Sequence, residues 1–402
     1  MRFETSRKFK SVNHFLYFTL DYTPRKKAAL HCLCKYVGDV SEKYPEKRDM
    51  AARKDDLYGT DVYCSYKVYG GLLTLFVHHS FLSPRFSKDV SLQEYLDFFK
   101  EVFFHVSFSR SSFEEYRRNI IDNISRRDEN PIRYSFNRVL QDLAKEDPVM
   151  AVYDYDYIKE LEELTLRDVT DVYEEVLHCS SVDQYLYGDL SEEEASLFEL
   201  FKGKEKHPIL ETQLYRGGVL PEKIERKDIH QSCLSLVYKT PYHYLHEDFY
   251  AWLLGNAFFG IVPTSLLFEE IREKHSLCYN IRSLDYKQHG LIVVRTEIEE
   301  ENAEEVKRLV EKEIRRLQEG DYEQEELDSA RLLLKNTIRS IRDDLSALSD
   351  FYHLNLLLRR EITIEEYERG LDSVRKEDIS RVFHAFSPVY THLLTGVSHQ
   401  AL

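Results

Sequence analysis

The stretch Leu253–Tyr279 reads LLGNAFFGIVPTSLLFEEIREKHSLCY and largely decides how the chain is interpreted. An apolar helix should end near Gly260, because glycine commonly closes helices. A second helix should begin at Ser265 and turn its leucine, phenylalanine and isoleucine side chains inward. Arg272 and Tyr279 then pass through a charged turn into a strand, so a guanidinium and a phenol hydroxyl can reach one carbonyl or carboxylate together. On spacing alone, a surface arginine and an ordinary strand tyrosine remain the alternative.

The pattern around this stretch repeats one found earlier in the chain. A helix that opens beside Asp168 is followed by a strand reaching Gly188, and a helix that opens beside Asp378 is followed by a strand reaching Gly396. An acid at a helix start is favoured by the positive end of the helix dipole. A duplicated α+β unit explains both ends of the repeat.

The repeat predicts the domain organisation. An N-terminal domain should cover residues 1–200, and a homologous C-terminal domain should cover residues 229–402. Between them, residues 201–228 hold two prolines, three glycines and many charges, which is typical of a linker. Strand pairs joined by short turns predict an α+β fold, in which each domain is a mainly antiparallel sheet with helices on one face.

Composition narrows the class of protein. The chain has 402 residues, 43% of them hydrophobic, and a formal net charge of −16, which argues against nucleic-acid binding. Six cysteines are too few for a disulfide framework at this length, so a reduced, cytoplasmic setting is expected. The first apolar segment alternates with polar residues and is interpreted as a strand, not a signal peptide. No apolar run is long enough to span a membrane.

The stretch Ser265–Tyr279 resembles the signature of the pitrilysin/insulinase zinc peptidases, in the branch of mitochondrial processing peptidase and its bacterial relatives. The resemblance covers nearly the whole chain, including the glycine pair 255/260 and the Lys239-Thr-Pro-Tyr segment. The segment Lys54–Gly59 is similar to a bacterial subfamily, the YfmF-like proteins linked to elongation factor P 5-aminopentanol modification. The resemblance implies that Arg272 and Tyr279 bind substrate backbone near the scissile bond, from the domain opposite the zinc.

Active members of this family bind zinc through H-x-x-E-H, and this motif is absent from the sequence. In its place the chain has His31, with Cys34 at the position of the glutamate and Lys35 at that of the second histidine. An ammonium group has no lone pair for a metal. The resemblance puts Asn123 at the distal ligand position, with Asp122 as the neighbouring register. The zinc site is therefore expected to be degenerate, and no catalytic residue or metal ligand is assigned to this chain.

Other histidine and cysteine groups have simpler interpretations. His31, Cys32 and Cys34 splay around a helix, which favours core packing, and His78 and His79 point to opposite faces of a strand. The segment His243–Glu247 has the wrong order for a zinc motif and is interpreted as a solvated helix start. An atypical enzyme that uses His31 and Cys34, either with a metal or as a Cys–His nucleophile, remains a minor hypothesis.

The sequence therefore predicts the non-catalytic, substrate-binding subunit of a heterodimeric zinc peptidase. Family resemblance implies that a homologous chain with intact H-x-x-E-H supplies the zinc and the base, and that no cofactor binds here. Peptides such as leader peptides or modification-linked substrates would be processed by the pair. The alternative is an inert peptide-binding or scaffold protein that acts without a peptidase partner.

Overall fold

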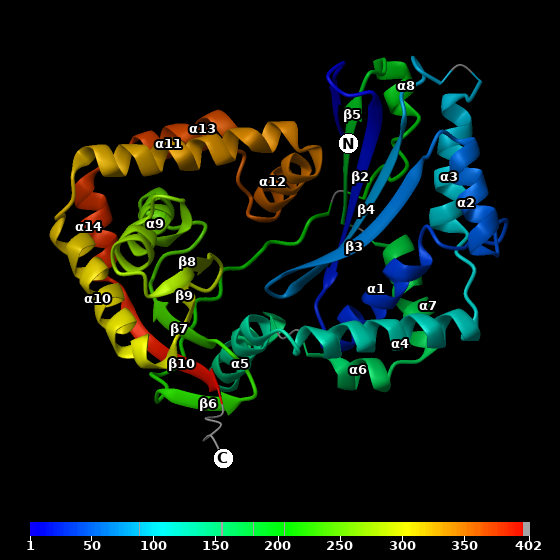
Figure 1. Ribbon diagram of the computed structural model, residues 1–402. Coiled ribbons are helices and arrows are strands. Elements are labelled where there is room, and N and C mark those ends of the chain that lie inside the picture. Colours follow the sequence, from blue (N-terminus) through cyan, green and yellow to red (C-terminus); the bar gives the residue numbers. More distant parts are fainter. Residues whose placement is uncertain (88, 154–155, 180, 205, 397–402) are drawn as a thin grey trace. The chain divides into compact units, whose positions relative to one another are not determined.

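The computed structural model describes residues 1–396 except 88, 154–155, 180 and 205, and these residues form two compact units (Figure 1). Unit 1 consists of Met1–Ile124, Tyr157–Glu211 and Arg342–Arg360. Unit 2 consists of Ser125–Asp156, Thr212–Ile341 and the described residues from Glu361 onward. No helix in the described part of the chain is both long and apolar enough to cross a membrane.

Unit 1 is built on a five-stranded sheet in the order β1-β5-β2-β4-β3. Its strands are β1 (Arg2–Thr5), β2 (Ser11–Asp21), β3 (Asp61–Tyr69), β4 (Leu72–Leu82) and β5 (Val182–Gly188). Only the β1–β5 pair is parallel among these neighbours. The helices of this part of the chain are α1 (Pro24–Tyr36), α2 (Lys47–Asp56), α3 (Leu92–Phe104), α4 (Arg110–Arg127), α6 (Ile158–Glu162), α7 (Leu166–Leu177), α8 (Glu192–Ser196) and α12 (Leu345–Leu357).

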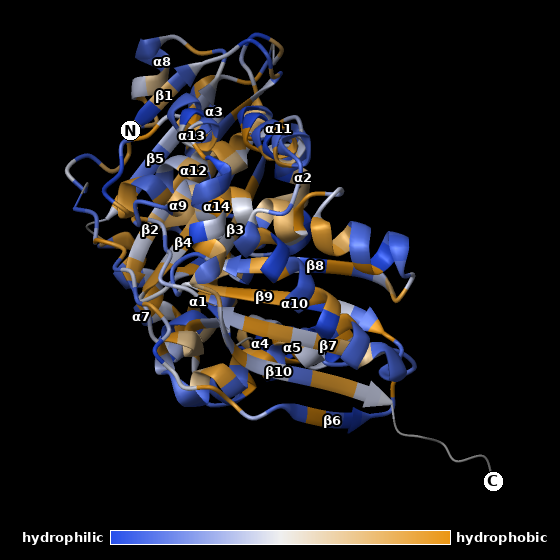
Figure 2. Cartoon of the chain, turned by 90° about the vertical axis from the view of Figure 1, so that its left-hand side faces the viewer, coloured by the Kyte–Doolittle hydropathy of each residue, from blue (hydrophilic) through white to orange (hydrophobic). Residues whose placement is uncertain are grey.

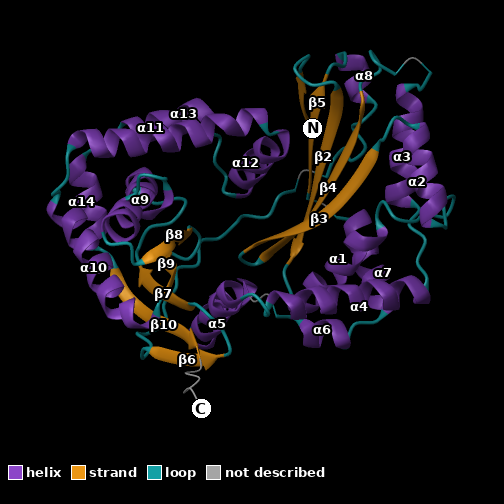
Figure 3. Ribbon diagram, in the orientation of Figure 1, coloured by secondary structure: helices purple, strands orange, loops and turns teal. Residues whose placement is uncertain are grey.

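Strand β2 buries both of its faces, because side chains alternate across a strand. Leu16 and Phe18 pack into the main core with residues of α1, α3 and α7. Tyr17 points to the other face, where its hydroxyl lies 2.7 Å from Ser349 Oγ and its ring stacks on His353, both in α12. Figure 3 shows α3 on one side of this sheet and α12 on the other.

Unit 2 has a second five-stranded sheet, in the order β6-β10-β7-β9-β8. Its strands are β6 (Lys223–Lys227), β7 (Ser232–Lys239), β8 (Cys278–Tyr286), β9 (Leu291–Ile298) and β10 (Ser387–Gly396). Its longer helices are α5 (Pro131–Glu146), α9 (Phe249–Asn256), α10 (Ala303–Glu319), α11 (Gln324–Ser340), α13 (Ile364–Asp372) and α14 (Lys376–His384). Its short helical segments include η1 (Pro148–Tyr153), η2 (Ala257–Ile261), η3 (Phe268–Lys274) and η4 (Glu300–Asn302).

The two sheets have the same strand order, which reproduces the repeat seen in the sequence. Helix α7 begins at Leu166 with a Thr165–Asp168 capping box, and β5 ends at Gly188. In the second half, α14 begins at Lys376 and β10 ends at Gly396. The predicted two-unit α+β fold with mainly antiparallel sheets is confirmed.

Each half of the chain places one helix in the unit built around the other half's sheet. Helix α12 comes from the second half but belongs to unit 1, whereas α5 comes from the first half but belongs to unit 2. In Figure 1 the teal α5 lies beside the red β10. The sequence predicted helices on only one face of each sheet. In the structure the other face also has a helix, α12 in unit 1 and α5 in unit 2. The domain boundaries inferred from the repeat, with a linker at residues 201–228, remain a prediction.

The sequence missed the strands β1 and β6, and β6 lies inside the expected linker. Each pairs with a single neighbour, in parallel, at an edge of its sheet. Charges suit such an edge because they discourage pairing with another chain. Figure 2 shows β6 mostly blue, whereas β7 and β9 carry long orange stretches. A short, charged edge strand therefore has little of the hydrophobic pattern that marks an interior strand.

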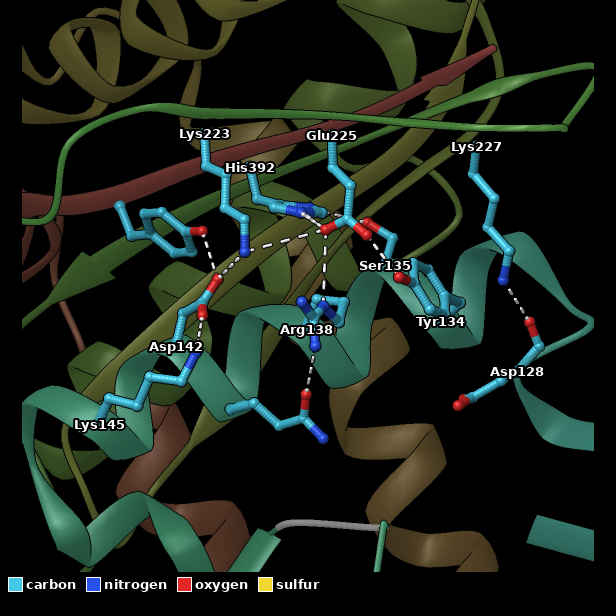
Figure 4. A network of polar contacts seen from close by, with 12 residues as sticks. Asp128, Tyr134, Ser135, Arg138, Asp142, Lys145, Lys223, Glu225, Lys227 and His392 are labelled. Atoms are coloured by element: carbon cyan, nitrogen blue, oxygen red, sulfur yellow. Dashed lines mark hydrogen bonds and ion pairs between the residues drawn. The ribbon is translucent and has the colours of Figure 1, made fainter. Parts of the chain in front are cut away.

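Helix α5 is held to sheet strands β6 and β10 by a network of polar contacts that includes the buried Asp142 (Figure 4). Asp142 accepts hydrogen bonds of 2.8 Å from Lys145, Lys223 and Tyr390. Glu225 lies 3.5 Å from both Arg138 Nε and His392 Nε2. Apolar residues of α5, including Val139 and Leu143, pack beside this network in one core with β7 and β9.

The buried histidine of β2 predicts a pH-dependent stability. Burial lowers the pKa of His14 to about 3, so protonation below its ordinary pKa of about 6.5 favours the unfolded chain. Its ring lies between those of Phe99 and Phe198. The contribution of the neutral His14 imidazole to the free energy of unfolding is complete above pH 6.5. It declines as pH falls, by about 2 kcal/mol between pH 7 and pH 5. Urea unfolding of His14→Phe at both pH values should show a smaller decline than the wild type, and equal declines would contradict it.

Candidate functional site

Arg272 and Tyr279 lie on either side of the turn between η3 and β8 in unit 2. Ile271 is fully buried, which turns the neighbouring Arg272 toward the surface. Preceding η3, the segment η2 contains Gly260, where a Cβ atom would meet the backbone nitrogen of Ser283 at 2.8 Å. Glycine is therefore required for η2 to pack directly on β8, the strand that carries Tyr279.

The structure brings the Arg272 and Tyr279 side chains together. The Arg272 guanidinium carbon lies 5.5 Å from the centre of the Tyr279 ring and 4.5 Å from that of Phe268. These distances are within the range of cation–π attraction. Arg272 also lies 3.6 Å from the carboxylate of Glu273, and the Tyr279 residue is 77% exposed. The Tyr279 phenol and the Arg272 guanidinium group therefore lie next to each other on the surface of unit 2.

Backbone hydrogen bonds fix the turn between the two residues. The Ser276 amide donates to the Arg272 carbonyl at 3.0 Å, and the Leu277 amide donates to the Ile271 carbonyl at 3.1 Å. Ser276 has a φ of +54°, in the left-handed region. The pairing of β8 with β9 shifts register between Cys278 and Ile281. Such an irregularity re-aims the side chain that it carries, here Tyr279.

Glu270 anchors η3 to its surroundings. Its carboxylate accepts a hydrogen bond of 2.9 Å from Lys274 and another from Lys312 of α10. Burial alone would raise the pKa of Glu270, but these two ammonium groups hold it at about 2, so the carboxylate stays charged. The segment that presents Arg272 is thus fixed by an ion pair as well as by the core.

The segment that the resemblance aligns with the zinc motif lies on α1 in unit 1. His31 Nδ1 lies 2.6 Å from the Tyr157 hydroxyl, which lies 2.8 Å from that of Tyr66 on β3. The ammonium group of Lys27, a buried residue, lies 4.6 Å from the centre of the Tyr157 ring. The His31 imidazole is thus hydrogen-bonded to a chain of two tyrosine hydroxyls. The Lys27 ammonium group beside Tyr157 would repel a metal ion.

The other motif positions are also unsuited to zinc. Cys34 Sγ lies 3.5 Å from Cys64 Sγ, and burial raises the pKa of Cys64, which disfavours the thiolate that binds metals. Lys35 is exposed, as are Asp122 and Asn123 on α4. In the described part of the chain, no group of three or more His, Cys, Asp or Glu side chains could hold a metal ion. The residues present do not fit the zinc of the peptidases that the sequence resembles.

The remaining histidine pairs have structural environments. His78 Nε2 lies 3.0 Å from Asn13 Oδ1, while His79 is buried against Phe99 on the opposite face. The helix expected to start at His243–Glu247 instead starts at Phe249 as α9. The Tyr157–Tyr66 pair beside His31 was missed by the sequence interpretation, because Tyr157 is 126 residues away along the chain and no spacing pattern links them.

Known proteins share this architecture. Residues 163–334 match the family model described as the Peptidase M16 inactive domain. The probable inactive metalloprotease YmfF of Bacillus subtilis (strain 168) is 24% identical over 406 residues, covering 97% of this chain and 94% of that protein. The resemblance to pitrilysin/insulinase peptidases without a working zinc motif is confirmed.

Solved structures agree in fold. A conserved protein from Enterococcus faecalis V583 superposes with a TM-score of 0.88 at 22% identity, covering 99% of this chain and 96% of the other. A peptidase M16 inactive domain from Pseudomonas fluorescens superposes with a TM-score of 0.77 at 16% identity, covering 100% and 96%. At these identities the superpositions establish the two-unit fold.

Proposed function

For this chain of the inactive M16 peptidase type, we propose the role of a non-catalytic, substrate-binding subunit in a heterodimeric zinc peptidase. Its partner would be a homologous chain with intact H-x-x-E-H, which supplies the zinc and the general base. This chain would supply Arg272 and Tyr279 as a clamp on the peptide substrate.

One observation carries the proposal: the clamp residues converge at an exposed position, whereas the motif on α1 is unsuited to zinc. The Arg272 guanidinium lies beside the ring of Tyr279, and the tyrosine is 77% exposed. At the other position, His31 contacts a tyrosine hydroxyl next to the buried Lys27. The chain therefore has the groups that would bind substrate but lacks those that would bind zinc and carry out hydrolysis, as expected for a partner subunit.

The clamp would act by positioning. Guanidinium N–H groups and the phenol O–H are donors, so both can bind carbonyl oxygens of an extended peptide. Holding the peptide in one register lowers the entropic part of the barrier for a reaction carried out by the partner. The anchored η3 segment keeps Arg272 in place before the peptide arrives.

Leader peptides and modification-linked substrates, including those tied to elongation factor P 5-aminopentanol modification, are the candidate substrates. We place the pair in the cytoplasm, since six free cysteines suit a reducing compartment. An inert peptide-binding scaffold that needs no peptidase partner is the second candidate, and the same exposed clamp would serve it.

Peptide binding by the isolated chain tests the clamp. A fluorescent, extended decapeptide should bind to the full chain, and mass spectrometry should recover it uncut with zinc present. Arg272→Ala should weaken binding about 10-fold or more, the usual loss for a hydrogen bond to a charged group.

Arg308→Ala is the matched control, because Arg308 is an exposed arginine of α10 that pairs with Glu305 on its own helix. Cleavage by the isolated chain would contradict the non-catalytic role, and equal affinities of wild type and Arg272→Ala would contradict the clamp.

A further inference from the structure

Two arginines face each other on the sheet of unit 2. Arg282 of β8 and Arg295 of β9 are direct cross-strand partners, so their side chains leave the same face of the sheet. Like charges in such a pair destabilise the sheet. The chain has 71 acidic and 55 basic residues, so carboxylates are plentiful elsewhere. The Arg282–Arg295 pair therefore lowers the stability of the sheet, and a functional role for the pair would explain its presence.

Neither guanidinium has an ion-pair or hydrogen-bond partner in the part of the chain that the structure describes. Among the described residues, Arg295 Nε is buried without a partner. The Arg295 guanidinium lies 4.3 Å from the centre of the Phe136 ring. Burial lowers the pKa of Arg295, and the charge of Arg282 lowers it further. A buried N–H donor without an acceptor is rare in folded proteins.

A small cavity beside the pair is lined mainly by hydrogen-bond donors. Its volume is about 40 Å³, enough for a few water-sized groups. It is lined by Ile132, Ser135, Cys233, Leu234, Ser235, Asn280, Arg282, Arg295, Thr296 and Glu297. Glu297 is the one carboxylate in this lining; its charge raises the pKa of Arg295 and partly offsets the repulsion from Arg282, but no ion pair joins it to either arginine in the described part of the chain. The cavity therefore offers two guanidinium groups and several hydroxyls.

We propose that Arg282 and Arg295 form a binding site for a carboxylate of the peptide substrate, an aspartate or glutamate side chain. Two guanidinium groups can donate to both oxygens of one carboxylate, which also removes their mutual repulsion. The inference rests on the proposed peptide-binding role and adds a preference for acidic peptides.

The position of the pair sets the spacing of that preference. Arg282 follows Tyr279 on the same strand, but the register shift between Cys278 and Ile281 shortens this stretch to about the length of two regular strand residues, roughly 7 Å. An extended peptide has the rise of a regular strand. The acidic side chain should therefore lie about two residues from the carbonyl held by Arg272 and Tyr279.

Fluorescence anisotropy with the full chain tests the site. Decapeptides carrying one glutamate, at positions scanned along an otherwise neutral sequence with an amidated C-terminus, are compared with the glutamine versions. The best glutamate peptide should bind about 10-fold more tightly than its glutamine version. Arg282→Gln and Arg295→Gln should remove this preference, so that each variant binds the glutamate and glutamine peptides with equal affinity. Arg308→Gln is the control for net charge and should keep the preference.

Thermal unfolding separates this inference from the proposed function. Acetate and inorganic phosphate, tested in turn at constant ionic strength, should raise the wild-type melting temperature, and the double variant Arg282→Gln/Arg295→Gln should lose that rise. A larger shift with phosphate than with acetate would overturn the carboxylate assignment. Equal binding of glutamate and glutamine peptides, with Arg272→Ala still weakening both, would overturn the arginine site but not the clamp. If no peptide binds while acetate still acts through the pair, the proposed function fails and the carboxylate site remains.

Discussion

Replacing Arg272 by alanine is expected to lower peptide cleavage by the mixed peptidase pair about 100-fold. This is the usual loss when one preorganised donor is removed from a reacting carbonyl, or when a substrate shifts by about 1 Å. Arg272 presents a fixed fork of donors beside Tyr279, and alanine leaves only that tyrosine. Steady-state cleavage of a fluorogenic peptide, with the zinc-bearing chain held constant, measures the effect.

Two conservative variants show which property matters. Tyr279→Phe keeps the ring beside Arg272 and removes only the hydroxyl, so its effect should be smaller, about 10-fold. Arg272→Lys keeps the charge but loses the fork, and it should fall between the wild type and alanine. Arg308→Ala should cleave at the wild-type rate. If Arg272→Ala also cleaved at that rate while still joining the pair, the clamp would play no part in the reaction.

Asp142→Ala is expected to destabilise the protein by about 2–3 kcal/mol, the usual loss when a buried, charged hydrogen-bond acceptor is removed. Asp142 is 9% exposed and accepts three hydrogen bonds of 2.8 Å, as Figure 4 shows for this network. Alanine would leave Lys223 and Tyr390 without their shared acceptor, on the seam that holds α5 to its sheet. Urea unfolding at pH 7 measures the change.

The neighbouring lysine provides the control. The Lys145 side chain is 68% exposed and binds the same carboxylate, so Lys145→Ala should cost about 1 kcal/mol or less. Burial favours the protonated form of Asp142, but Lys145, Lys223 and Tyr390 hold its pKa well below the ordinary value. Its contribution is therefore complete above about pH 4 and declines as pH falls below that. A loss similar to that of Lys145→Ala would mean that the network does not hold α5.

Much of the fold was predictable because its signals are local. The capped helix beside Asp168, its repeat beside Asp378, and the strands ending at Gly188 and Gly396 all appear where the sequence places them. Gly260 also marks a real constraint, the close packing on Ser283. Periodicity, caps and close-approach glycines depend on neighbouring residues, so they can be recognised without the structure.

Features that depend on distant contacts were not predictable. Nothing in the sequences of helices α5 and α12 shows which sheet each one covers. The bond between His31 and Tyr157, and the pairing of Arg282 with Arg295, depend on the folded register. The sequence therefore predicted only part of the candidate site. Arg272 and Tyr279 lie close in sequence, but the residues that surround this pair and the Arg282–Arg295 pair come from elsewhere in the chain.

Cleavage of a peptide by this chain, by its H-x-x-E-H partner and by the two mixed at equal concentration tests the central claim most directly. The account predicts cleavage by the mixture and none by this chain, with the mixture at least about 10-fold faster than the partner alone. Cleavage by this chain alone, or a partner whose rate this chain leaves unchanged, would contradict it.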